Sequence, residues 1–224
     1  MIIETLTLYT KNIVAQKNFY AAVLELPVSD SQTDSFTVHT QKGTIVFRQN
    51  EKFTPYHFAF TIPGESIFKA LSWLKKRVSI IKNESEEVVD FPAWNAKSVY
   101  FYDEDRNIVE FIARKNLPYP MLQSFDASQL YEVSEIGLAT SAFHEKLQKL
   151  LNIPGMSKFS GGDEVFAALG SETGLVILID KGKKNWFPGN DTAFSSEFDA
   201  VITTPQGRFQ LNFTADTLEY DSKS

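Results

Sequence analysis

Residues 100–114 read YFYDEDRNIVEFIAR, a pattern that predicts a β-hairpin. Apolar and aromatic residues fill most of both predicted strands, yet Glu110 lies in the middle of the second one. A buried carboxylate is unfavourable unless it is paired or coordinates a metal ion. Glu110 therefore either faces water or holds a partner.

The composition is typical of a folded globular protein, and the absence of cysteine excludes thiol chemistry. Hydrophobic residues make up 43% of the 224 residues, and the chain contains 19 Phe, which favours β structure. There is no cysteine, so disulfides, thiolate metal sites and a cysteine nucleophile are excluded. The only histidines are His39, His57 and His144, and His144 falls among charged residues of a predicted helix, where we expect it to be exposed.

The charge and the hydropathy pattern exclude several classes of partner. A formal net charge of −6 provides no basic surface for nucleic acid or for anionic membranes. No run approaches the roughly 20 apolar residues that a membrane span needs. The N-terminal residues also lack the apolar core of a signal peptide. We therefore expect a cytoplasmic protein that binds neither nucleic acid nor membranes.

The predicted elements recur in the same order along the chain. A strand over ETLTLYT (4–10) is followed by an amphipathic helix and by two short strands around Gly43, which is suited to the positive φ of such turns. Residues 56–114 repeat this order, and residues 133–178 repeat it again. The fourth copy, FDAVITTPQGRFQLNF (198–213), has room for two strands but not for a helix.

These patterns predict an α+β fold of four βαβββ units in two pairs, with the last unit reduced. The segment LPYPMLQSFDASQ is rich in turn-forming residues and lacks periodicity. We therefore expect a first paired module over residues 1–116, a linker over 117–129 and a second, reduced module over 130–224.

The paired βαβββ units, the helix end FYAAVLELP (19–27) and the hairpin DEDRNIVEF (103–111) resemble the vicinal oxygen chelate superfamily. This group includes glyoxalase I, extradiol ring-cleaving dioxygenases, and fosfomycin and bleomycin resistance proteins. Members usually read Asp-Pro-Asp-Gly-Asn where this chain has Glu104 and Arg106 in place of the proline and the glycine. The resemblance implies that two units curl into a half-open barrel around one divalent metal ion, with ligands from the first and last strands of the units.

Carried over by position, the resemblance implies His57 and Glu110 as metal ligands, from the first and last strands of the second unit. Thr5 occupies the corresponding first-strand position of the first unit, where a histidine is common, and is at best a weak ligand. Val46 occupies the last-strand position, where glyoxalase-type members often have a carboxylate. The ligand set is therefore incomplete compared with the two histidines and one carboxylate of non-haem iron oxygenases.

The third and fourth units match the ligand positions less well. Glu135 and Ile177 occupy the first-strand and last-strand positions of the third unit, and Asp199 and Gln210 those of the fourth. The resemblance therefore assigns the candidate site to the first module.

Strand alternation indicates which side chains share the ligand side of the sheet. Phe58 and Phe60 are expected to face the helices, so that His57 faces the opposite, concave side together with Glu110. His39 could share this face by the same alternation. Trp94 and Asn95, just before a predicted strand, are candidates to line the mouth of the same cavity.

Two main functions remain open. The resemblance implies a metal-dependent small-molecule enzyme, a dioxygenase or lyase, in which Fe, Mn, Zn or Ni acts as a Lewis acid. The alternative is a metal-free protein of the bleomycin-resistance type, a homodimer that sequesters an apolar or aromatic small molecule. A third function, that of an interaction protein with a degenerate site, is favoured by the sheet edge that the shortened fourth unit would leave.

Overall fold

The computed structural model describes the backbone of residues 1–223 and the side chains of all of these except residues 30 and 31. Over this range the chain forms two mixed sheets with few and short helices, which confirms the expected α+β class. None of the helices within residues 1–223 combines the length and the hydropathy that crossing a membrane requires.

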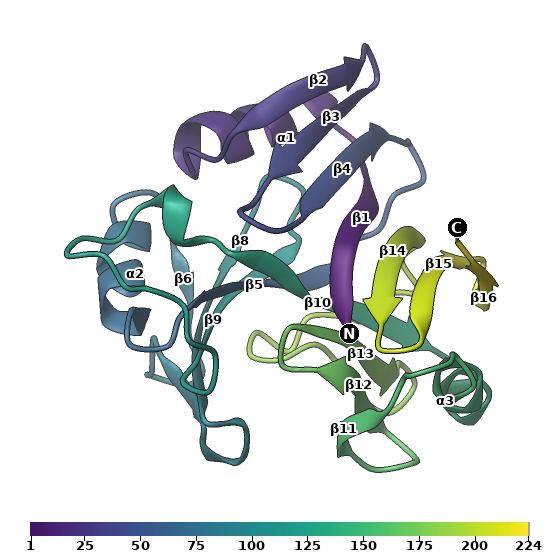
Figure 1. Ribbon diagram of the computed structural model, residues 1–224. Coiled ribbons are helices and arrows are strands. Elements are labelled where there is room, and N and C mark those ends of the chain that lie inside the picture. Colours follow the sequence, from purple (N-terminus) through teal and green to yellow (C-terminus); the bar gives the residue numbers. More distant parts are fainter. Residues whose placement is uncertain (224) are drawn as a thin grey trace.

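The first sheet combines the two ends of the chain, and its strand order is β16-β15-β14-β1-β4-β3-β2 (Figure 1). β1 lies between β14, to which it is antiparallel, and β4, to which it is parallel. The elements of this half are β1 (Ile2–Thr10), α1 (Ile13–Asn18), η1 (Phe19–Val23), β2 (Val28–Gln32), β3 (Ser35–His39), β4 (Thr44–Gln49), β14 (Phe198–Thr204), β15 (Gly207–Thr214) and β16 (Thr217–Ser222). As expected, the last segment of the chain has no helix between its strands.

The second sheet is built from the middle of the chain, in the order β11-β12-β13-β10-β5-β9-β8-β6, with β7 paired to β8. β5 and β9 run parallel, whereas β5 and β10 run antiparallel. The elements are β5 (His57–Pro63), α2 (Ile67–Leu74), β6 (Ile80–Ile81), β7 (Val89–Phe91), η2 (Pro92–Trp94), β8 (Ala96–Tyr102), β9 (Ile108–Arg114), η3 (Ala127–Gln129), β10 (Glu132–Thr140), α3 (Phe143–Leu151), β11 (Lys158–Gly161), β12 (Phe166–Ser171) and β13 (Gly174–Asp180).

The pairing of strands corrects the expected division of the chain. Each sheet takes strands from both sides of residues 117–129, so residues 1–116 do not form a self-contained module. The physical reason is that periodicity defines the strands within one unit but does not say which unit they join. The first strands of all units carry similar apolar patterns, and packing of the whole chain selects the pairs β1–β14 and β5–β10.

One large apolar core extends beneath both sheets. Leu6 of β1 and Leu138 of β10 belong to the same cluster of buried residues, together with side chains of α2 and α3. Phe58 and Phe60 of β5 also lie in this core, as their alternation predicts. The opposite face of β5 is therefore free to present polar side chains to a ligand.

Asp103 builds the turn between β8 and β9. Its Oδ1 accepts hydrogen bonds from the backbone N–H groups of Asp105 (3.1 Å) and Asn107 (2.9 Å). Its Oδ2 accepts from the Tyr20 hydroxyl (2.8 Å) and from Gln16 Nε2 (2.5 Å). The first carboxylate of the DEDRN string therefore fixes the hairpin against the N-terminal helical segment and holds β9 in place.

Close approach of backbones explains two hairpin glycines. Gly43 is not among the glycines with positive φ in residues 1–223, which corrects the expected turn conformation. A Cβ on Gly43 would lie 3.0 Å from the Ile3 carbonyl oxygen, and one on Gly174 would lie 2.7 Å from the Met1 carbonyl oxygen. Both glycines therefore make room for the N-terminal strand.

Candidate metal centre

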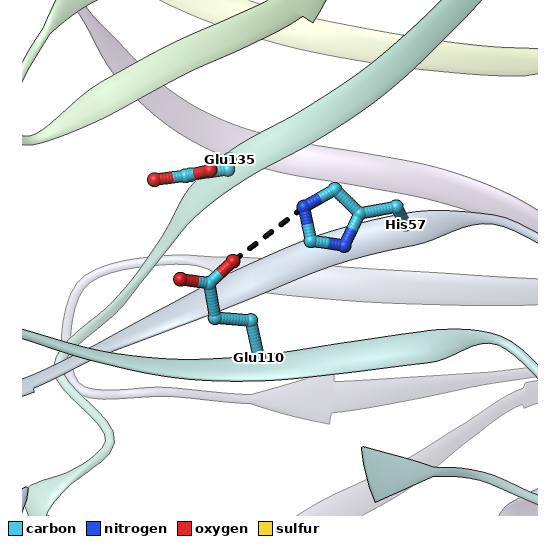
Figure 2. Close-up of side chains that lie close together, drawn as sticks. All are labelled: His57, Glu110 and Glu135. Atoms are coloured by element: carbon cyan, nitrogen blue, oxygen red, sulfur yellow. Dashed lines mark ion pairs between the residues drawn. The ribbon is translucent and has the colours of Figure 1, made fainter. Parts of the chain in front are cut away.

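Three buried titratable side chains from neighbouring strands converge on one face of the second sheet. They are His57 on β5, Glu110 on β9 and Glu135 on β10, and Figure 2 shows their heads close together. One ligand atom from each lies within 4.8 Å of the others, and His57 Nε2 is 3.5 Å from Glu110 Oε2. The register explains the cluster, because Ala59, two residues after His57, is opposite both Glu110 and Glu135.

The His57 ring is oriented so that it can serve as a ligand. Its Nδ1 lies 3.3 Å from the Ile108 carbonyl oxygen, which can only accept a hydrogen bond. The proton therefore resides on Nδ1, and the lone pair of Nε2 faces the carboxylates. Burial lowers the pKa of His57 and so favours the neutral imidazole that binds metal ions.

The two carboxylates are buried next to each other. Burial raises the pKa of Glu110, and the charge of Arg114 and the Ser98 and Tyr100 hydroxyls oppose this rise. Burial, reinforced by the charge of Glu110, raises the pKa of Glu135 to about 7. Two acidic groups in a dry site favour binding of a cation or of a proton.

A cavity of about 340 Å³ opens in front of this cluster. His57, Glu110 and Glu135 all line it, and Lys184 is the cation among its lining residues. Its walls are mainly aromatic and come from Phe91, Trp94, Tyr100, Phe166, Trp186 and Phe187. The cavity thus combines a polar base with walls suited to a planar, apolar small molecule.

Trp186 covers His57 from the long connection between β13 and β14. The two ring centroids are 5.2 Å apart. Trp186 packs against Gly137 of β10 so closely that a Cβ there would lie 2.7 Å from Trp186 Cη2. The Tyr102 hydroxyl, 2.8 Å from Asp191 Oδ2, ties the same connection to β8.

The structure brings His57, Glu110 and Trp94 to one cavity. Glu135 completes the cluster in the place that sequence reasoning gave to Thr5. The signal for Glu135 was present, since it occupies the first-strand position of the third unit. Recognising it requires the β5–β10 pairing, which the local pattern does not reveal.

Three residues that sequence reasoning associated with the site lie elsewhere. Thr5 and His39 belong to the first sheet and do not line the cavity; Thr5 Oγ1 accepts a hydrogen bond from Thr44 (3.3 Å). His39 Nε2 lies 2.7 Å from the Ser29 hydroxyl. Asn95 has left-handed backbone, and its Nδ2 donates to Asn116 Oδ1 at 2.8 Å, outside the cavity.

Comparison with known proteins shows the fold. No family model matches the chain, and no curated protein matches it. A putative dioxygenase from Bacillus subtilis subsp. subtilis str. 168 is 16% identical, with a TM-score of 0.57 over 80% of this chain and 63% of that chain, slightly less than two thirds. The glyoxalase/dioxygenase-type fold that the sequence resemblance implied is therefore confirmed.

Two further solved structures match about half of the chain. Lactoylglutathione lyase from Agrobacterium tumefaciens is 16% identical, with a TM-score of 0.45 over 52% of this chain and 96% of that chain. A glyoxalase/bleomycin resistance protein/dioxygenase from Nocardioides is 17% identical, with a TM-score of 0.42 over 55% of this chain and 90% of that chain.

Proposed function

We propose that the chain is a metal-dependent enzyme of the glyoxalase/dioxygenase type, which holds a divalent ion with His57, Glu110 and Glu135 and acts on a small aromatic molecule. The observation that carries this proposal is the convergence of three ligand atoms within 4.8 Å at the base of an aromatic cavity. The donor set fits Fe²⁺, Mn²⁺, Zn²⁺ or Ni²⁺, since each accepts imidazole nitrogen together with carboxylate oxygen.

A divalent ion bound there would supply Lewis-acid polarisation of the oxygen atoms of the substrate. The residues of the chain supply the rest. Trp94 and Trp186 line the cavity and provide flat apolar surfaces for a ring. Burial and the charge of Glu110 raise the pKa of Tyr100 well above its usual value, so its phenol stays protonated and its hydrogen bond helps to orient the Glu110 carboxylate.

The ligand set bears on the class of reaction. Non-haem iron oxygenases use two histidines and one carboxylate, whereas here one histidine is joined by two carboxylates. This departure favours a lyase-type or isomerisation chemistry, in which the ion only polarises the substrate, over chemistry with dioxygen.

A metal-free binding protein is the second candidate function. The observation that favours it is that each carboxylate already has a partner in the chain. Glu135 accepts a hydrogen bond from Arg114, and the Tyr100 hydroxyl stabilises the charged form of Glu110. The aromatic cavity would then sequester a ligand through its walls alone.

Thermal unfolding with and without added metal ions tests the choice. We expect one of the four ions, at about 100 times its dissociation constant, to raise the melting temperature of the native chain by roughly 5–10 °C. The increase should disappear in His57→Ala, Glu110→Gln and Glu135→Gln. His144→Ala, at an exposed position on α3, is the matched control and should keep it. If no ion shifts the transition of the native chain at millimolar concentration, the metal-free function is favoured instead.

A further inference from the structure

Arg114, the last residue of β9, is an arginine with no exposed surface. Its Nη2 donates a hydrogen bond to Oε1 of Glu135. Its Nε and Nη1 find no acceptor among the described residues. The Trp94 ring, which forms part of the cavity wall, has its centroid 5.9 Å from the Arg114 Cζ atom.

Stability alone is a poor reason for this arrangement. A guanidinium carries five N–H donors, and three of them, on Nε and Nη1, have no partner among the described residues. Buried ion pairs are often no more stable than apolar side chains of similar size, even when their hydrogen bonds are complete. The position of Arg114 therefore calls for an explanation in terms of Glu135.

A count of charges gives that explanation. A divalent ion with two neutral histidines and one carboxylate leaves a net charge of +1 at the centre. In this chain Glu135 replaces one neutral imidazole, and the same count for His57, Glu110 and Glu135 gives zero. Arg114 adds one positive charge directly on Glu135 and returns the sum to +1.

We propose that Arg114 is a positioning residue of the metal centre, which holds the Glu135 carboxylate in place and compensates for the charge that this ligand adds. The inference rests on the proposed function, because it assumes that the three residues bind an ion. Arg114 is not among the residues that line the cavity. It acts through Glu135, as hydrogen-bonded partners of metal ligands commonly do.

Calorimetric titration of the full chain with Mn²⁺ tests this role. Arg114→Met should weaken Mn²⁺ binding about 10–100-fold, the usual effect of losing a partner of a metal ligand. The control is Arg77→Met, because Arg77 also stacks on a tryptophan, Trp73, and pairs with a glutamate, but at the surface. We expect this variant to bind Mn²⁺ as the native chain does.

The decisive comparison repeats the substitution in a Glu135→His background. A neutral imidazole needs no counter-charge, so a retained Arg114 would repel the ion there. We expect Arg114→Met to weaken binding in the native background but to strengthen it in the Glu135→His background. A role in folding alone would not reverse sign in this way.

The outcomes separate this inference from the function on which it rests. If the native chain binds no divalent ion, the proposed function fails and this inference fails with it. If the native chain binds Mn²⁺ but Arg114→Met binds it equally well or better, or if the sign does not reverse, only the role of Arg114 is overturned. Arg114→Gln, which removes the charge but keeps a donor, replaces Arg114→Met if the latter does not fold.

Discussion

At the scale of single residues, the carboxylate in the middle of β9 does not face water. Glu110 is buried beside His57 and Glu135, and the pKa values of both carboxylates are raised chiefly because burial disfavours their charged forms. The charged forms of the two buried carboxylates are therefore unfavourable by themselves, and binding of a proton or of a metal ion reduces this cost.

Without metal, the contribution of Glu135 to the stability of the protein should fall as the pH rises from about 5 to 8. The pKa of Glu135 is about 7 in the folded protein against 4.5 as its ordinary value. The stabilising contribution is complete below about pH 4.5 and is lost as the pH rises through 7, because the folded state then no longer binds the extra proton. The difference is on the order of 3 kcal/mol.

Urea unfolding in the presence of a chelator, at pH 5 and pH 8, measures this effect. Glu135→Gln cannot ionise, so its stability should depend on pH less than that of the native chain, by up to the same 3 kcal/mol order of magnitude. An equal pH dependence in the two proteins would contradict a buried, proton-binding Glu135.

The affinity for a metal ion should change with pH in the opposite direction. A carboxylate must lose its proton before it binds a cation, so protonation of Glu135 competes with the ion. With a pKa of about 7, affinity for Mn²⁺ should rise roughly tenfold between pH 6 and pH 8. Calorimetric titrations at the two pH values check this, and an affinity independent of pH would show that Glu135 is not a ligand.

At the scale of elements, register and one close contact between backbone and side chain build the site. β5, β9 and β10 are adjacent, and their pairing aligns three side chains on one face. The connection from β13 to β14 then brings Trp186 over His57, and Gly137 provides the space. The position of Trp186 in the cavity wall therefore depends on the absence of a side chain at Gly137 of β10.

Gly137→Ala should displace Trp186 from the cavity wall. Its Cβ would lie 2.7 Å from Trp186 Cη2, and such overpacking destabilises proteins by about 1–3 kcal/mol. Gly162→Ala is the control, because no atom lies within 4 Å of the added Cβ and its φ is not among the positive ones. Urea unfolding should show a loss of stability only in Gly137→Ala, and a crystal structure of that variant should show the ring moved. Equal stability of both variants would mean that the contact relaxes freely.

At the scale of the whole molecule, strands from the two ends of the chain pair in one sheet. β1 pairs with β14 near the opposite end of the chain, and Figure 1 shows the two strands side by side in purple and yellow. One large apolar core lies beneath both sheets. Neither half of the sequence therefore contains a complete sheet.

This topology predicts how fragments of the chain behave. Residues 1–116 and residues 117–224 should each fail to fold alone, because each fragment lacks strands of both sheets and would expose the shared core. Produced together, the two fragments should associate and unfold in one cooperative transition. Circular dichroism and gel filtration measure both properties. A cooperative, monomeric fragment 1–116 would support the division by modules instead.

Much of the site could be predicted from sequence because it depends on positions within one unit. The alternation of side chains along β5 puts His57 on the face opposite the core residues Phe58 and Phe60. The hairpin around Asp103 forms β9, which carries Glu110 and runs parallel to β5 as its neighbour in the sheet. Strand alternation and short connections are local properties, so the pair His57 and Glu110 follows from them. Trp94, close to this hairpin in sequence, reaches the cavity for the same reason.

The contribution of distant segments was decided by tertiary structure alone. Glu135 replaces Thr5 in the cluster because β5 pairs with β10 rather than with β1, and Trp186 and Arg114 contribute through contacts that no periodic pattern encodes. Unpaired strand edges are chemically alike, since every one offers the same backbone N–H and C=O groups. Sequence therefore determined the fold class and two of the candidate ligands. The packing of one shared core determined which units meet, and with them the third ligand, its counter-charge and the wall of the cavity.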